Sequence, residues 1–180
     1  MATKREATVD DLYRVEGKAE LVNGELVLMS AAGARHGWIA GKIFASLLVH
    51  GERTGSGYAL PDNVGFVVNL PNRRSFSPDA AFCIQPITDE FVDGAPVFAV
   101  EVRSPEDYGP VAERSLAAKR ADYFAAGTKV VWDVDVKEQL IRAYRANEPA
   151  GPRTFRRGEH ADAEPALSAW SMPVDDLFSG

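Results

Sequence analysis

The sequence predicts an α/β (α+β) fold in which a mixed β-sheet carries helices on its flanks. Two segments with helical spacing alternate with short apolar runs bounded by Pro, Gly and Asn, and this order is typical of a sheet covered by helices. The chain has 180 residues, of which 46% are hydrophobic and 26% charged, as in an ordinary globular domain. We therefore expect residues 1–180 to form one domain.

The N-terminal part predicts a short helix followed by a β-hairpin. The hydroxyl of Thr8 can cap a helix that extends to about Glu16, and an acidic residue three positions after it completes a box-like start. Residues 18–29 predict a hairpin, because Asn23 and Gly24 tolerate the positive φ of a two-residue turn.

The rest of the chain predicts two longer helices and a series of strands. Apolar residues at helical spacing predict a helix over residues 36–50, which Gly51 or Gly55 ends. A second helix starts near Pro110 and stops at Gly127, because proline suits a first turn and glycine takes the left-handed cap. The predicted strands cover residues 64–69, 80–84, 96–102, 129–134 and 139–144, and residues 174–178 are helix-like.

Charge and cysteine content narrow the function classes. The net charge of −6 argues mildly against nucleic acid as a binding partner, because phosphate binding needs localised positive charge or a bound cation. One cysteine excludes an intramolecular disulfide, and no apolar run is long enough to span a membrane, so we expect a cytoplasmic protein with no membrane partner. Clustered arginines are the candidate contacts to nucleic acid: Arg142, Arg145, Arg153, Arg156 and Arg157.

Three segments carry side chains suited to metal chemistry. Asp79 starts one predicted strand, Glu101 lies near the end of the most apolar strand, and Lys119 lies in the helix that follows. Because residues i and i+2 of a strand share a face, Glu101 and Arg103 should point the same way. If Asp79 lies on a neighbouring strand, two carboxylates and a backbone carbonyl can converge on a hard cation such as Mg²⁺.

Each of these residues also has a structural interpretation. Asp79 follows a proline, where turn residues are common, and Arg103 can pair with nearby acids at the surface. Lys119 lies on the small, apolar face of its helix with Tyr123, where it either extends to water or directs its ammonium at the carboxylates. For Glu101 a functional role is favoured over a structural one, because charged residues at the ends of buried strands are uncommon without a partner.

A set of motifs, taken in order, resembles the Uma-two family of restriction-endonuclease-like proteins in the PD-(D/E)XK nuclease superfamily. The resemblance covers roughly Thr8 to Arg145 and rests on the order and spacing of the motifs. It implies a restriction-endonuclease-like fold and Mg²⁺-dependent hydrolysis of DNA, with Mn²⁺ as an alternative ion. The motifs are Glu20-Leu-Val-Asn-Gly24-Glu25, Arg35-His36, Ser77-Pro78-Asp79, Glu101-Val-Arg-Ser104-Pro105, and Lys119 with Tyr123, Gly127 and Trp132-Asp133.

The resemblance also implies roles for single residues. Asp79, Glu101 and the backbone carbonyl of Val102 match the metal ligands, and Lys119 matches a catalytic lysine that has moved to the following helix. Arg103 departs from the superfamily pattern, which places lysine there; arginine stays protonated, so it can stabilise charge on a phosphate but cannot act as a base. Supporting roles fall to Glu20, His36 and Tyr123.

Two other hypotheses remain open at the level of sequence. One is a catalytically silent nucleic-acid-binding or protein-interaction module on the same fold, because Arg103 and the negative net charge leave room for it. The other is an unrelated small α/β protein in which Glu101, Arg103 and Lys119 form a structural ion network. If DNA is the substrate, a homodimer is expected from chemistry, since cutting both strands of a duplex calls for two sites.

Overall fold

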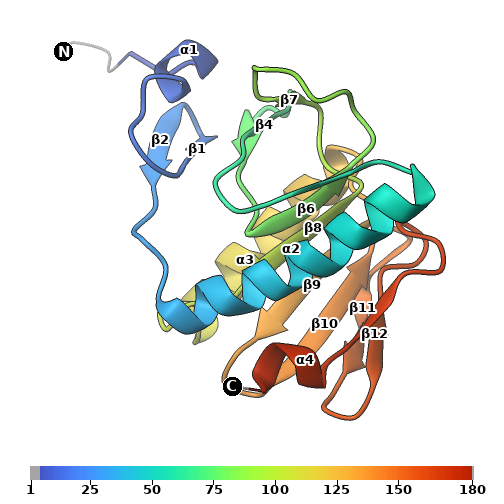
Figure 1. Ribbon diagram of the computed structural model, residues 1–180. Coiled ribbons are helices and arrows are strands. Elements are labelled where there is room, and N and C mark those ends of the chain that lie inside the picture. Colours follow the sequence, from blue (N-terminus) through green and yellow to red (C-terminus); the bar gives the residue numbers. More distant parts are fainter. Residues whose placement is uncertain (1–4, 180) are drawn as a thin grey trace.

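A six-stranded mixed sheet with helices on both faces forms the centre of the computed structural model, which describes residues 5–179 (Figure 1). In spatial order its strands are β11 (Glu148–Phe155), β10 (Leu140–Arg145), β9 (Val130–Asp135), β8 (Phe98–Val102), β6 (Ala80–Cys83) and β3 (Tyr58–Leu60). Strands β8 and β9 run parallel, and the other neighbours are antiparallel. The predicted mixed sheet flanked by helices is confirmed.

Two long helices cover the sheet. Helix α2 (Ala34–Thr54) crosses the face that Figure 1 shows in front, and α3 (Pro110–Ala125) lies behind the sheet. Helix α2 ends at Gly55, whose φ of 64° suits glycine, whereas Gly51 lies inside the helix. Helix α3 begins with the predicted proline and is followed by Gly127 at φ 105°, so both of its expected ends are confirmed.

The N-terminal segment forms a separate small layer at the top of Figure 1. Helix α1 (Val9–Leu12) is shorter than expected, but the predicted cap at Thr8 is present. Strands β1 (Ala19–Val22) and β2 (Glu25–Leu28) form the predicted hairpin around Asn23 and Gly24, which have φ values of 50° and 71°. Residues 29–33 then lead down to the start of α2.

The remaining elements are short. The predicted strand over residues 64–69 is reduced to β4 (Phe66–Val67), which lies between β5 (Ser75–Phe76) and β7 (Val92–Asp93). Strands β12 (His160–Asp162) and β13 (Ser171–Pro173) pair with each other, and α4 (Asp175–Phe178) packs beside α2. Within residues 5–179, none of the helices has the length and apolar character that crossing a membrane requires.

Alternation along β8 divides the core into two layers and decides where polar groups lie. Phe98, Val100 and Val102 join the cluster that includes α2 and α4, whereas Ala99 joins the cluster on the side of α3. Glu101 therefore shares the α3 side of the sheet with Ala99. This placement brings one end of β8 under the middle of α3.

Candidate active site

Carboxylates from three distant segments meet near the ends of β6 and β8. The register sets Ala80 opposite Val100, so Asp79, one residue before β6, lies beside Glu101. Asp79 Oδ2 accepts a hydrogen bond of 2.7 Å from the backbone N–H of Val102. Glu20, on the inner strand of the N-terminal hairpin, is the third carboxylate. Asp79 and Glu101 therefore lie side by side, as the metal site expected from the sequence required.

Lys119 connects two of these carboxylates. Its Nζ lies 2.8 Å from Glu101 Oε1 and 2.8 Å from Glu20 Oε1, and its side chain is 17% exposed. Burial alone would lower the pKa of Lys119, but the charges of Glu101 and Glu20 raise it above its ordinary value. Of the two alternatives for Lys119, the structure shows the one in which the ammonium is directed at the carboxylates, and the side chain stays protonated.

Glu101 is the carboxylate with the least compensation. Tyr123 donates its hydroxyl hydrogen to Glu101 Oε1 over 2.7 Å, the same oxygen that Lys119 contacts. Burial raises the pKa of Glu101, and the nearby charges of Asp79 and Glu20 raise it further against the opposing effect of Lys119. Its second oxygen makes no hydrogen bond or ion pair within the described part of the chain. A bound cation would compensate this group.

Asp79 lies between two positively charged or polar donors. Lys18 Nζ is 2.7 Å from its Oδ1, and His36 Nε2, in the first turn of α2, lies 3.2 Å from its Oδ2. Burial would raise the pKa of Asp79, but the hydrogen bond from His36 and the charge of Lys18 hold it well below its ordinary range. Lys18 also contacts Asp62 Oδ1 at 2.7 Å, so it retains a carboxylate partner if Asp79 turns away.

Glu20 has further partners on both of its oxygens. Arg73 Nη1 lies 2.6 Å from Glu20 Oε2, and the backbone N–H of Ser77 donates to Glu20 Oε1 over 2.9 Å. Arg73 Nε in turn donates to Asp122 Oδ2 over 2.8 Å. Burial would raise the pKa of Glu20, but the charges of Lys119 and Arg73 outweigh it and lower the pKa. These contacts give Glu20 the means to fix the position of Lys119.

Lys18 and Arg73 are the members of the site that sequence reasoning missed. Lys18 precedes Glu20 by two residues, so the i, i+2 rule for a strand would have placed both on one face. Arg73 lies in the turn before β5 and carries no local signal. Its partners Glu20 and Asp122 are brought to it only by the tertiary fold.

Arg103 differs from its predicted position at a phosphate. Its Nε and Nη2 each donate to one oxygen of Asp133 over 2.7 Å. The remaining N–H groups reach Glu113, with one contact of 3.1 Å and a shorter one, and the carbonyl of Asp107 at 3.3 Å. We correct the prediction on this ground, because all five guanidinium donors are engaged and two carboxylates balance the charge. For this residue the geometry agrees with the structural ion network.

The arginine segment also differs from the expected basic surface. Arg142 pairs with Asp135 at 2.9 Å, and Arg145 and Arg153 lie 3.1 and 3.4 Å from the two oxygens of Asp162. Asp175 pairs with Arg157, so Arg156 is the one arginine of these five whose side chain makes no ion pair with the described residues 5–179. The acidic partners lie outside the arginine segment, so the local count of charges overestimated its positive field. We correct this prediction as well.

The donor set suits a hard divalent cation. Val102 N donates to Asp79 and Val100 O accepts from Asp79 N, whereas Arg103 N donates to β9. In a strand the N–H and C=O of one residue point the same way, so the Val102 carbonyl is directed toward Asp79. No three acidic, His or Cys side chains among residues 5–179 form a metal cluster by themselves. Mg²⁺ does not need three such side chains, because it is bound by one or two carboxylates together with waters and substrate phosphates.

Comparisons with known proteins bear on the family and the fold of this chain. The sequence model of the Uma2 family, described as "Putative restriction endonuclease", matches residues 8–175. The crystal structure of "a putative nuclease belonging to DUF820" from Anabaena variabilis is similar, with a TM-score of 0.75 and 18% identity over 96% of this chain and 97% of that chain. No curated protein matches the sequence. The structural likeness establishes a shared fold, and the expected fold class is confirmed.

Proposed function

Because this chain belongs to the Uma2 family, whose description is "Putative restriction endonuclease", we propose that it hydrolyses phosphodiester bonds of DNA with the aid of a bound Mg²⁺ ion. The observation that carries the proposal is the convergence of Asp79, Glu101 and Lys119 from three separate segments on one end of the sheet. An acidic protein with such a site can approach a phosphate through a cation and an ammonium group together.

The proposed cation site consists of oxygen ligands only. Asp79, Glu101 and the carbonyl of Val102 would hold Mg²⁺, and Mn²⁺ prefers the same ligands. When bound, Mg²⁺ acidifies a water molecule and polarises the scissile phosphate. Lys18 would release Asp79 Oδ1 and keep its contact with Asp62 at 2.7 Å. The oxygen of Glu101 that Lys119 and Tyr123 leave free supports this assignment, because an open carboxylate oxygen is available to bind a cation.

Lys119 supplies fixed positive charge to the phosphate. Its raised pKa keeps the ammonium protonated, so it stabilises negative charge on a phosphate oxygen and orients water, but does not act as a base. Glu20 and Tyr123 act through other groups, because Glu20 holds the ammonium at 2.8 Å and Tyr123 holds Glu101 at 2.7 Å. His36 holds Asp79 in the same way.

Plasmid and single-stranded DNA incubated with the purified protein test this proposal. Cleavage is expected with Mg²⁺ or Mn²⁺ and none with EDTA. Cutting a duplex would call for two sites and hence a homodimer, which light scattering detects, whereas cutting a single strand needs one site. Inertness with every metal and substrate would leave the silent binding module as the better account.

A further inference from the structure

We propose that Lys18 is a built-in counter-cation of the candidate metal site, which competes with a divalent cation for Asp79 and withdraws to Asp62 when it loses. This inference rests on the proposed nuclease function and names the group that regulates its metal binding. The Lys18 ammonium lies 2.7 Å from Asp79 Oδ1 and 2.7 Å from Asp62 Oδ1, so one side chain contacts both carboxylates. Lys18 is therefore placed to leave Asp79 without losing its other partner.

The two oxygens of Asp79 have different partners. Oδ2 accepts a hydrogen bond of 2.7 Å from the backbone N–H of Val102 and lies 3.2 Å from His36 Nε2. Among residues 5–179, Lys18 is the only hydrogen-bond or ion-pair partner of Oδ1. A divalent cation on Oδ1 would lie beside the ammonium, and two cations on one oxygen repel each other. Lys18 thus controls whether Oδ1 can bind a metal.

Lys119 has no such conflict with a metal. Its Nζ lies 2.8 Å from Glu101 Oε1, the oxygen to which Tyr123 also donates a hydrogen bond. The second oxygen of Glu101 has no hydrogen-bond or ion-pair partner in the described part of the chain. A cation can therefore bind Glu101 while Lys119 keeps its position. The two lysines of the site consequently have different tasks, since Lys18 has to move and Lys119 does not.

Asp62 provides the place to which Lys18 withdraws. Asp62 Oδ1 accepts a hydrogen bond of 2.7 Å from the backbone N–H of Asn63, so this carboxylate is already held where Lys18 contacts it. The side chain of Asp62 is 41% exposed, whereas that of Asp79 is 6% exposed. Movement toward Asp62 therefore carries the ammonium from a buried carboxylate to a solvated one, where water also stabilises its charge.

The ion pairs around the site leave room for a dication together with Lys18. Within residues 5–179 these ion pairs contain more carboxylates than Lys and Arg side chains, and His36 adjoins Asp79 as well. The carboxylates are those of Glu20, Asp62, Asp79, Glu101 and Asp122, and the Lys and Arg side chains are Lys18, Arg73 and Lys119. Because negative charge is in excess, Lys18 can stay paired with Asp62 while a second cation takes its place at Asp79.

Titration of the full-length protein with Mn²⁺ in the absence of DNA tests the inference, because the electron paramagnetic resonance signal of the free ion shows how much is bound. Lys18→Gln removes the charge and keeps an N–H donor for Asp79. We expect it to bind Mn²⁺ about tenfold more tightly than the wild type, which is within the usual range of coupling between two ligands of one protein. Asp62→Asn removes the second partner of Lys18 and should weaken Mn²⁺ binding, because the ammonium then stays at Asp79.

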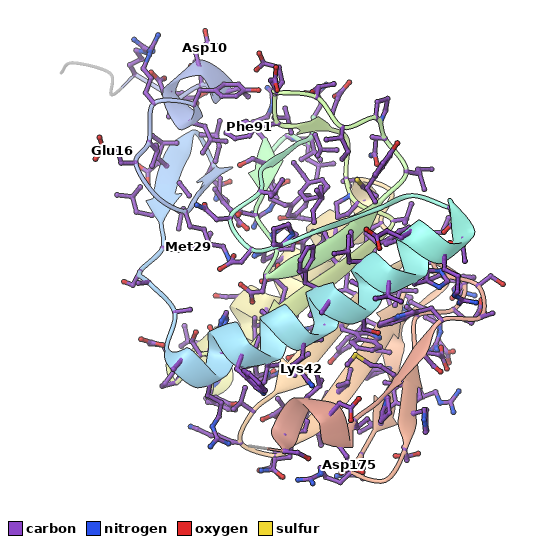
Figure 2. All side chains as sticks on the ribbon, in the orientation of Figure 1. Asp10, Glu16, Met29, Lys42, Phe91 and Asp175 are labelled. Carbon is purple, nitrogen blue, oxygen red and sulfur yellow. The ribbon has the colours of Figure 1, made fainter. Side chains whose placement is uncertain are left out.

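Two controls separate this exchange from a general effect of charge. Independent charges change the affinity additively, whereas Asp62 acts through Lys18 in this account. The double variant Lys18→Gln with Asp62→Asn should therefore bind Mn²⁺ as tightly as Lys18→Gln alone. Glu16→Gln removes an exposed carboxylate two residues before Lys18, which Figure 2 shows on the outer side of the N-terminal layer, and should leave Mn²⁺ binding unchanged.

Unchanged Mn²⁺ affinity in Lys18→Gln, or additive changes in the double variant, would overturn the inference. Asp62 is exposed, so Asp62→Asn provides a test even if Lys18→Gln does not fold. Wild-type affinity in Asp62→Asn would also refute the exchange.

The results also distinguish this inference from the proposed function. Metal-dependent cleavage of DNA, with equal Mn²⁺ binding by the wild type and all variants, would refute the exchange and leave the nuclease standing. The expected order of Mn²⁺ affinities without cleavage under any metal would support the exchange and refute the nuclease. If neither the wild type nor folded Lys18→Gln bound Mn²⁺, the exchange and the proposed metal site would both be refuted.

Discussion

Replacing Arg103 by alanine should destabilise the protein strongly, because it leaves a buried carboxylate without its main partner. Asp133 is 2% exposed and receives two hydrogen bonds of 2.7 Å from Arg103; without them its nearest cation is Arg120, at 3.6 Å. Removing one partner of a buried ion pair costs about 3–5 kcal/mol. For a chain of this length about 2–4 °C is lost per kcal/mol, so Tm should fall by about 6–20 °C.

Thermal and urea unfolding of matched variants measure this effect. Glu113→Ala is the control, because the Glu113 side chain is 49% exposed and its pairing with Arg103 is worth about 1 kcal/mol or less. Arg103→Lys keeps the charge but loses the paired hydrogen bonds, and should fall between the two. The reasoning is refuted if Arg103→Ala melts like wild type. If Arg103→Lys lost cleavage at an unchanged Tm, the result would instead support the expected role of Arg103 in stabilising charge on the phosphate.

The other predictions concern the carboxylate site. Lys119→Ala should lower the single-turnover rate of DNA cleavage about 100- to 1,000-fold, the effect of removing one donor from a developing charge, and a rate near wild type would exclude this role. Mg²⁺ at about 100 times its Kd should stabilise the wild type by about 2.7 kcal/mol in calorimetric melts, and both Asp79→Ala and Glu101→Ala should abolish the shift. Glu20 has a lowered pKa in the folded state, so its stabilising effect is present above its ordinary value of 4.5 and is lost as pH falls. In urea unfolding, the free energy of unfolding should therefore fall less steeply with decreasing pH in Glu20→Gln than in the wild type. Parallel pH dependences in the two proteins would contradict the lowered pKa of Glu20.

Local signals in the sequence identified the elements whose ends depend on single residues. Asn23 and Gly24 adopt the positive φ that their turn requires, and the proline and glycine around α3 mark its ends as expected. Strand β11 was missed because it contains Pro149, Gly151 and Pro152, which disfavour a central strand. The two prolines are tolerated because β11 lies at the edge of the sheet, where a residue without an N–H need not lose a hydrogen bond to a neighbouring strand.

The site was predictable where its residues carry their own signal. Asp79, Glu101 and Lys119 could be singled out because each is a charged residue in an apolar setting. Arg73 could not, since it reaches Glu20 across 53 positions of sequence, whereas Lys18 was signalled only by its spacing of two residues from Glu20 and reaches Asp79 across 61 positions. The same non-local contacts explain the two corrections, because the carboxylates that balance Arg103 and most of the arginine segment come from other parts of the chain.

Single-turnover cleavage of labelled DNA by carboxylate variants tests the central claim most directly. The comparison sets Asp79→Ala and Glu101→Ala against Glu106→Ala, which removes an exposed carboxylate five residues from Glu101. We expect wild type and Glu106→Ala to cleave with Mg²⁺ and to stop in EDTA, and the two site variants to be inactive while still folded. Cleavage that persists in either site variant, or in EDTA, would contradict the account.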